Sequence, residues 1–299
     1  MARTLFRLFV FFGLPGLLTA QSSLAYQLKK GDVFTVEQKA EQHIIQNLDE
    51  TSHELTNRVT GVLQFNVVQE SDTAYVLEFM FNDLIFKIES SLQGVLLDVH
   101  AAEPEAGDTQ AEIFNSLLNI PVLMTLSKQG EILEVSGGDQ LVSKVLEQSG
   151  IPEGFSRTVM KKSLEQQYGS KALAESYEQM TFFYPGQPVR EGDQWSNQYE
   201  GKLEALNTWT LDSLNTGSAY ISGKAKILIK TDEPSNTMRL EGEQQTSVMT
   251  DMASGFMREM NVQTRAEGIS TAAQMGDVQI PTVVNSNVTY RLIAQKNVQ

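Results

Sequence analysis

The stretch Ala219-Tyr220-Ile221-Ser222-Gly223-Lys224-Ala225-Lys226-Ile227-Leu228-Ile229-Lys230 alternates small or apolar residues with polar ones along most of its length. A period of two places the apolar side chains on one face of an extended strand and the polar side chains on the other. This pattern is typical of an antiparallel strand with one buried face and one solvated face. The segment therefore predicts a β-strand and, where the pattern recurs, a mainly antiparallel β protein.

The same alternation recurs in residues 59–68 and 284–292. Residues 74–88 are instead apolar on both faces apart from Asn82-Asp83, which predicts either a central strand buried on both sides or a bent strand. Residues 125–135 read as a hairpin around Lys128-Gln129-Gly130. Further turns are expected at 70–72 and 215–217.

Helical periodicity is concentrated in the middle of the chain. Two prolines in residues 181–192 predict a joint after it, because proline interrupts a helix. Gly169 separates the last two helices. The expected helices are 110–118, capped by Asp108 or Thr109, 140–148, capped by Asp139, 156–168, capped by Ser156, and one that starts at Ser170 and runs to about Met180.

Short echoes link the two ends of the chain and predict either a duplication or a chance match. Phe34 and Trp195 each follow a Gly-Asp turn and are expected to point inward. The echoed pairs are Gly31-Asp32-Val33-Phe34 with Gly192-Asp193-Gln194-Trp195, Thr73-Ala74-Tyr75-Val76 with Ser218-Ala219-Tyr220-Ile221, and Ile120-Pro121 with Ile280-Pro281.

The fold class predicted from these patterns is α+β and mainly antiparallel β. Two arrangements fit: two pseudo-repeated β units, or one strongly curved half-barrel sheet, in either case packed on a central helical segment. The expected boundaries are 1–25 for a signal peptide, 26–137 for the first β unit, 138–181 for a helical insertion and 182–299 for the second β unit. All parts after the signal are expected to pack as one globular body.

The amino-terminal segment has the order of a secretory signal peptide. Arg3 and Arg7 precede the apolar run 8–18, and the small residues of Ser23-Leu24-Ala25 follow it. Cleavage after Ala25 would make Tyr26 the first mature residue, and Gln21 is the alternative start. The protein is therefore expected to be exported, to the periplasm or the exterior.

Three motifs carry a resemblance to a known family. They are Leu28-Lys29-Lys30-Gly31-Asp32, the run Thr125-Leu126-Ser127-Lys128-Gln129-Gly130-Glu131-Ile132-Leu133-Glu134-Val135-Ser136-Gly137, and the stretch 183–195. With these K-x-G-D and L-S-x-x-G-E-x-L-E-V-x-G motifs the chain resembles a family of secreted bacterial proteins, a domain of unknown function. The resemblance implies export and a bacterial source, and it implies no catalytic residue and no ligand.

Composition excludes several classes of function. The chain has no cysteine, which excludes disulfides, thiol nucleophiles and cysteine metal ligands. Its formal net charge of −14 repels phosphate backbones, so no nucleic-acid partner is expected. No stretch after the signal is long and apolar enough to predict a membrane span.

Motifs for catalysis and metal binding are incomplete. His53-Glu54-Leu55-Thr56-Asn57 begins like a zinc-protease helix but has Asn57 where the second histidine belongs. Ordinary surface or strand histidines are the preferred interpretation of His43, His53 and His100. The alternative is a metal site in which His43 and His53 face each other across a hairpin, with His100 and Glu41 or Glu54 as further ligands. We therefore predict no catalytic, cofactor-binding or metal-binding residues, no cofactor, and ligand-binding residues that the sequence leaves unknown.

Two functions remain, and the first is preferred. It is a non-catalytic envelope protein that binds an apolar small molecule or a partner protein, in a groove between the sheet and the helices at 138–180. The alternative is a carboxylate-based hydrolase of the periplasm or exterior. A cluster of methionines was considered as a pocket lining, with core filling the preferred interpretation: Met249, Met252, Met257 and Met260.

Overall fold

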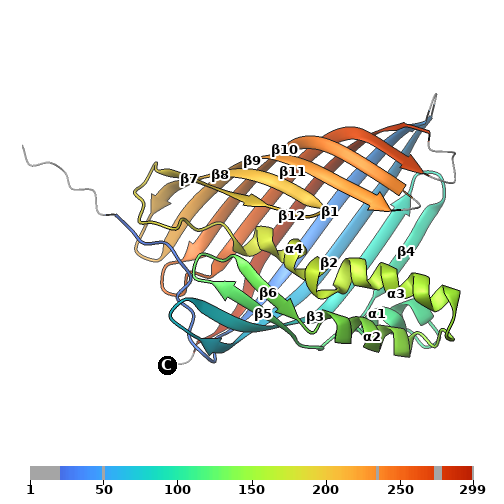
Figure 1. The fold of residues 1–299 in the computed structure, drawn as a ribbon, viewed down its shortest axis with the longest axis horizontal. Helices are drawn as coiled ribbons and strands as arrows, with labels where there is room; N and C mark the ends of the chain where they lie inside the picture. The colour runs from blue at the N-terminus through green and yellow to red at the C-terminus, as the bar shows by residue number, and fades with distance from the viewer. Residues whose placement is uncertain (1–20, 49–50, 234–235, 273–277, 298–299) are drawn as a thin grey trace, which may run out of the picture.

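A computed structural model describes residues 21–48, 51–233, 236–272 and 278–297 (Figure 1). Most of the predicted signal segment, residues 1–20, lies outside the described residues. The strands are β1 (Val33–Leu48), β2 (Thr51–Glu70), β3 (Ala74–Ser90), β4 (Gly94–His100), β5 (Val122–Ser127), β6 (Ile132–Ser136), β7 (Gln194–Tyr199), β8 (Leu203–Leu214), β9 (Ser218–Glu233), β10 (Asn236–Asp251), β11 (Met257–Ala272) and β12 (Ile280–Lys296). The helices are α1 (Thr109–Asn115), α2 (Gly138–Gln148), α3 (Phe155–Tyr168) and α4 (Ser170–Thr181).

The twelve strands of the described residues form one open antiparallel sheet. Its order is β6-β5-β3-β2-β1-β12-β11-β10-β9-β8-β7, and β4 pairs with the carboxyl-terminal part of β3, residues 85–90. The first strand of the chain therefore pairs with the last in the middle of the sheet, over a register running from Val33 opposite Lys296 to Gln46 opposite Thr282. The continuous-sheet alternative of the sequence analysis is the arrangement that the structure shows.

This order leaves β6 and β7, which are consecutive in the chain, at opposite edges of the sheet. The segment between them, which contains α2, α3 and α4, has to cross from one edge to the other. Helix α4 contacts both β6 and β7, so the sheet curves around it. Figure 1 shows the strands arching behind the helices, with α1, α2 and α3 grouped near β3 and β4.

The two faces of the sheet differ in chemistry. The inward face of β1 presents Phe34, Val36, Gln38, Ala40, Gln42, Ile44, Gln46 and Leu48, because alternate residues share one face. The outward face of the same strand presents charged residues such as Glu37, Lys39 and Glu41. Strand pairing carries this alternation across the sheet, so the face that α4 covers is the apolar one.

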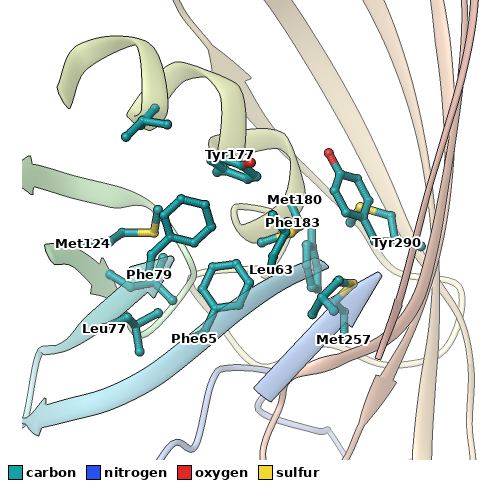
Figure 2. Packing of buried hydrophobic residues seen from close by; sticks show 14 of the residues in the cluster. Leu63, Phe65, Leu77, Phe79, Met124, Tyr177, Met180, Phe183, Met257 and Tyr290 are labelled. Atoms are coloured by element: carbon teal, nitrogen blue, oxygen red, sulfur yellow. The ribbon is translucent and has the colours of Figure 1, made fainter. Parts of the chain in front are cut away.

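The core lies on this inner face, beneath α4 and the segments at 22–28 and 182–189. Phe34 stacks on Phe256 with 4.1 Å between ring centroids, and Phe79 lies 4.8 Å from the ring of Tyr177 on α4. Figure 2 shows Tyr177 reaching from the helix toward Phe79, with Met180 and Phe183 close by. Contacts of this kind stabilise the crossing of the helical segment over the sheet.

The structure confirms most predicted elements and corrects two helix caps. Asp108 caps α1 by accepting a hydrogen bond from Ala111 N at 3.0 Å, and α3 ends at Gly169. Helix α2 instead begins after Gly137, and α3 begins after Gly154, in both cases without a side-chain cap. Strand β3 has a register shift opposite Val62 and Leu63, so it is the bent strand of the two alternatives.

The two Gly-Asp turns have the same local structure. Lys29 N donates to Asp32 Oδ2 at 2.9 Å, and Arg190 N donates to Asp193 Oδ2 at 2.8 Å. The second echo is out of phase, because Tyr75 is buried whereas Tyr220 is exposed. The similarity is thus shown for the turns, and duplication of whole units stays a prediction.

The tryptophan burial predicted for Trp195 is only partly found. Trp195 is half-buried and donates its indole N–H to Phe183 O at 2.9 Å, whereas Trp209 on the neighbouring strand is 1% exposed. A methyl group on Gly223 would collide with the Trp209 ring, so the glycine leaves room for the indole. The larger buried surface therefore belongs to Trp209.

We expect Trp209→Ala to lower the free energy of unfolding by about 3–5 kcal/mol, as for other fully buried aromatic residues. Trp195→Ala should cost about 1–2 kcal/mol, for partial burial and one hydrogen bond. Urea unfolding of the two variants and the parent protein measures both. Equal costs at the two positions would contradict the packing described above.

Candidate functional site

A cavity lies between the inner face of the first strands and the helices. Its volume is about 190 Å³, and Val59 and Phe86 form its sheet side while Tyr168, Leu173 and Tyr177 form its helix side. The remaining lining residues are Gln38, Phe81, Leu84, Gln167 and Ser176. The position agrees with the groove expected between the sheet and the helices.

A second cavity of about 250 Å³ lies among α1, α2 and α3. Gln167 and Tyr168 line both cavities, so the end of α3 separates them. The other residues that line the second cavity are Gln110, Ile113, Phe114, Leu117, Val145, Met160, Ser163 and Leu164. Neither set of lining residues contains a charged side chain.

The cavity tyrosines stay neutral. Burial raises the pKa of Tyr168 to about 12 and raises the pKa of Tyr177 well above its ordinary value. Both hydroxyls therefore remain protonated across the physiological pH range. The two cavities offer apolar surface and a few neutral polar groups, which is the usual chemistry of a small-molecule site and not that of proton transfer.

The inner face stays uncharged beyond the cavity. Following the strand register along β1, β2, β3 and β7–β12, the only described inward side chain that is Asp, Glu, Lys or Arg is Glu70, which lies at the exposed end of β2 opposite Tyr75 and eleven residues along the strand from Val59. Past Val59 toward the β1–β2 turn the inward residues Gln42, Ile44, Leu55 and Asn57 are half-buried. A half-buried, uncharged stretch of the inner face, which we call the trough, therefore continues from the cavity.

Acidic residues gather instead at the seam where α4 lies between the sheet edges. A hollow of about 300 Å³ there is lined by Ile132, Lys171, Ala174, Glu175, Glu178, Glu200 and Gly201. Burial raises the pKa of Glu178 to about 7, and repulsion from Glu131, Glu200 and Glu175 adds to the effect. A carboxyl group of this kind exchanges a proton near neutral pH.

A wider hollow of about 970 Å³ lies against β8, β9 and β10. Among its lining side chains, Glu204, Leu206, Lys226, Glu241 and Glu243 belong to the outward face by strand alternation. Lys230 lies 2.6 Å from Glu204 in an ion pair. This open, charged surface is chemically unlike the cavity beneath the helices.

The three histidines do not come together. His43 faces outward beside Glu41 at 2.8 Å, and His53 faces inward beside Ser90 at 2.9 Å, so the alternative in which the two face each other is not the arrangement found. His100 lies 3.1 Å from Asp83 at the end of β4. In the described part of the chain no group of at least three His, Cys, Asp or Glu residues is placed to hold a metal ion.

The four methionines at 249–260 line neither of the two cavities beneath the helices. Met257 and Met260 are buried in the core, and Met249 and Met252 are half-buried. The residues that sequence reasoning missed are the neutral polar ones along the inward face of β1. Their signal was present, since Gln38, Gln42 and Gln46 are spaced by four and alternate there with Ala40 and Ile44.

The chain belongs to a family of unknown function, DUF6263, whose family model matches residues 72–257. The match includes α1–α4 and the cavity residues Phe81 to Tyr177, whereas Gln38 and Val59 precede it. A search of curated proteins gave no match. None of the helices in the described residues is long and apolar enough to cross a membrane.

Among solved structures, a lipovitellin structure reported for its lipid–protein interactions is similar in fold, with a TM-score of 0.52 at 9% sequence identity. The likeness covers 91% of this chain but only 26% of the lipovitellin chain, so this chain spans about a quarter of that protein. An outer membrane channel from Pseudomonas putida F1 also matches at 9% identity, covering 90% of this chain and 97% of the channel. Its TM-score of 0.26 carries no argument about fold or function.

The raised pKa of Glu178 predicts a pH-dependent stability. Folding raises this pKa from 4.5 to about 7, so folding takes up a proton in that window and the free energy of unfolding falls as pH rises through it. Glu178→Gln removes this fall in the free energy of unfolding, because an amide side chain does not ionise. We expect the variant to exceed the parent by about 1–2 kcal/mol above pH 7, after allowance for solvent screening, and to match it near pH 4.

Urea unfolding between pH 4 and pH 8 measures this difference. Glu147→Gln, at an exposed position of α2, is the matched control and should follow the parent over the whole pH range. A Glu178→Gln variant that stays parallel to the parent over the whole range would show that Glu178 is solvated in the folded protein.

Proposed function

We propose that this protein is a non-catalytic, exported envelope protein that binds the apolar part of an amphiphile between the inner face of β1–β3 and helices α3 and α4. The observation that carries the proposal is the uncharged inner face. It includes both the cavity at Val59 and Phe86 and the trough beyond it. Among the described side chains of these strands only Glu70, at the far end of β2, is charged and faces inward, so the cavity and the trough offer a surface suited to apolar chains.

The cavity dimensions set how a ligand enters. At about 190 and 250 Å³ the two cavities are each smaller than a typical ligand site of about 300–1,000 Å³. A bound chain therefore has to extend into the trough or move Tyr168, which separates the cavities. The fold likeness to lipovitellin, a protein reported for lipid–protein interactions, supports an apolar ligand class.

Export is part of the proposal, and the packing bears on where processing occurs. Ser22 N donates to Val189 O at 2.8 Å, Val189 N donates to Ser22 O at 3.0 Å, and Leu24 is buried. Cleavage after Ala25 would remove these contacts from the folded protein. We therefore propose Gln21, the alternative in the sequence analysis, as the first residue after processing.

One observation favours the hydrolase alternative. Glu178, with a pKa of about 7, lies in a hollow that Glu175 and Glu200 also line. A protonated carboxyl beside a carboxylate is the pair that acid-assisted hydrolysis requires. Retention of a bound amphiphile unchanged over hours, measured by mass spectrometry, separates binding from hydrolysis of an ester or glycosidic ligand.

We expect the delipidated, folded protein to bind the uncharged dye N-phenyl-1-naphthylamine saturably, with micromolar affinity, about −8 kcal/mol. Val59→Trp fills the cavity and should lower the affinity for the dye at least tenfold, as measured by fluorescence titration. Thr60→Trp, on the same strand but facing outward, is the matched control and should bind as the parent does. Unchanged binding by the Val59 variant would place the dye elsewhere.

Processing is tested on protein purified from its native host. We expect mass spectrometry of the amino-terminal peptide to begin at Gln21, because residues 22–24 pack in the fold. A peptide beginning at Tyr26 would contradict the packing argument. A peptide beginning at Met1 would contradict export.

A further inference from the structure

A row of amide and hydroxyl side chains crosses the inner face beside the cavity. The strand register places Asn57 opposite Gln42, Gln42 opposite Ser286, Ser286 opposite Thr264, and Thr264 opposite Gln244. All five point to the same face as Val59, because each lies an even number of residues from the inward positions of its strand. We call these five residues the polar row.

The polar row lies at the trough end of the cavity. Asn57 is two residues from Val59 along β2, a rise of about 7 Å in an extended strand. Asn57, Gln42, Ser286 and Thr264 are half-buried, so a molecule in the trough reaches them. The apolar residues Ile44 and Leu55 follow on the far side, and the row is thus a polar band within an apolar surface.

The row keeps hydrogen-bonding capacity in reserve. Asn57 Nδ2 donates to Gln42 Oε1 at 3.1 Å, and Thr264 Oγ1 donates to Gln244 Oε1 at 3.2 Å. Among the described residues the Gln42 NH2 group donates no hydrogen bond to the protein. The same register continues through Ala225 to Asn207, which is 2% exposed and whose Nδ2 has no partner in the described chain.

Unpaired amide donors favour a ligand with acceptor oxygens, such as an ester, an amide or a hydroxylated group. The absence of Lys and Arg from the described inner face disfavours a carboxylate or phosphate, since a desolvated anion without a counter-charge is costly. No described inward residue next to the polar row is Asp or Glu, which disfavours a cationic group for the same reason. If the polar row were only a solvated part of the surface, charged residues would be tolerated there. The outward face of the same strands does carry charged residues.

We infer that the ligand is an amphiphile whose polar group is uncharged, with its apolar chain in the cavity and its polar group at Gln42 and Asn57. This inference rests on the proposed function and specifies its ligand class. A monoacylglycerol has the required chemistry: one apolar chain, an ester carbonyl that accepts, and hydroxyls that both donate and accept.

The test compares three ligands with the same sixteen-carbon chain at pH 7.5: monopalmitoylglycerol, palmitate and hexadecyltrimethylammonium. Displacement of N-phenyl-1-naphthylamine gives the relative affinities. The parent protein should prefer the neutral ligand about tenfold over each ion. Gln42→Lys should shift the preference to palmitate, and Gln42→Glu should shift it to the ammonium compound.

Asn287→Lys is the matched control, because it adds the same charge to an exposed outward position that pairs with Glu41 next to Gln42. It should leave the preference unchanged. If the Gln42 variants do not fold, as judged by circular dichroism, Asn57→Leu is tested in their place. It should lower the affinity for monopalmitoylglycerol about tenfold while the dye still binds.

The outcomes separate this inference from the proposed function. Equal affinity for the three ligands, or a preference for an ion, would overturn the neutral-ligand inference while apolar binding stands. A preference in the Gln42→Lys variant identical to that of the parent would overturn the placement of the polar group. Binding of neither dye nor lipid would overturn the proposed function itself.

Discussion

The pairing of β1 with β12 determines how the rest of the molecule is arranged. It joins the two ends of the chain in the middle of one sheet, and so places β6 and β7 at opposite edges. The 137–193 segment then has to pass from edge to edge, and the contacts of Tyr177 with Phe79 show that it passes over the inner face. Without the β1–β12 ladder the two halves would be separate sheets, and no element would be required to cross between them.

The crossing gives one face of the sheet two different roles. Near Phe34 and Phe79 the inner face is covered closely by aromatic residues and stabilises the fold. Toward Val59 and Phe86 the helices leave a cavity, and beyond it the face is only half-buried. Both regions are uncharged. Stability requires this only of the covered region near Phe34 and Phe79, where a buried charge would be costly. The uncharged character of the second region is the property that the proposed function explains.

Local patterns predicted most of the elements but not their assembly. Alternation in 219–230 and the turn at 128–130 report on neighbouring residues, and both predictions were confirmed as β9 and the β5–β6 hairpin. The β1–β12 pairing joins residues more than 200 positions apart, for which a single sequence holds no local signal. The three pairs of similar motifs suggested repeated units. The Gly-Asp turns do have the same local structure, yet in the second pair Tyr75 points inward and Tyr220 outward, so similarity of short motifs did not fix the face on which they lie.

The candidate site was predictable in position but not in composition. A groove between sheet and helices was predicted from the apolar strand at 74–88, from the methionines at 249–260 and from the lack of a catalytic motif, although these methionines line neither cavity. Tyr168 was not identified because its role depends on where α3 ends relative to the sheet, which is set by tertiary packing. The alternation of Gln42 with Ala40 and Ile44 is present in the sequence, but Gln42 was not identified because its neighbours Asn57 and Ser286 become known only from the strand register.

Native mass spectrometry of the protein purified from its own host, without detergent or denaturant, tests the central claim most directly. The account predicts a fraction of the protein carrying a single adduct whose mass, after release and fragmentation, is that of an uncharged amphiphile with at least one long apolar chain. Protein that is folded and carries no adduct, and that acquires none when incubated with host lipid extract, would contradict it.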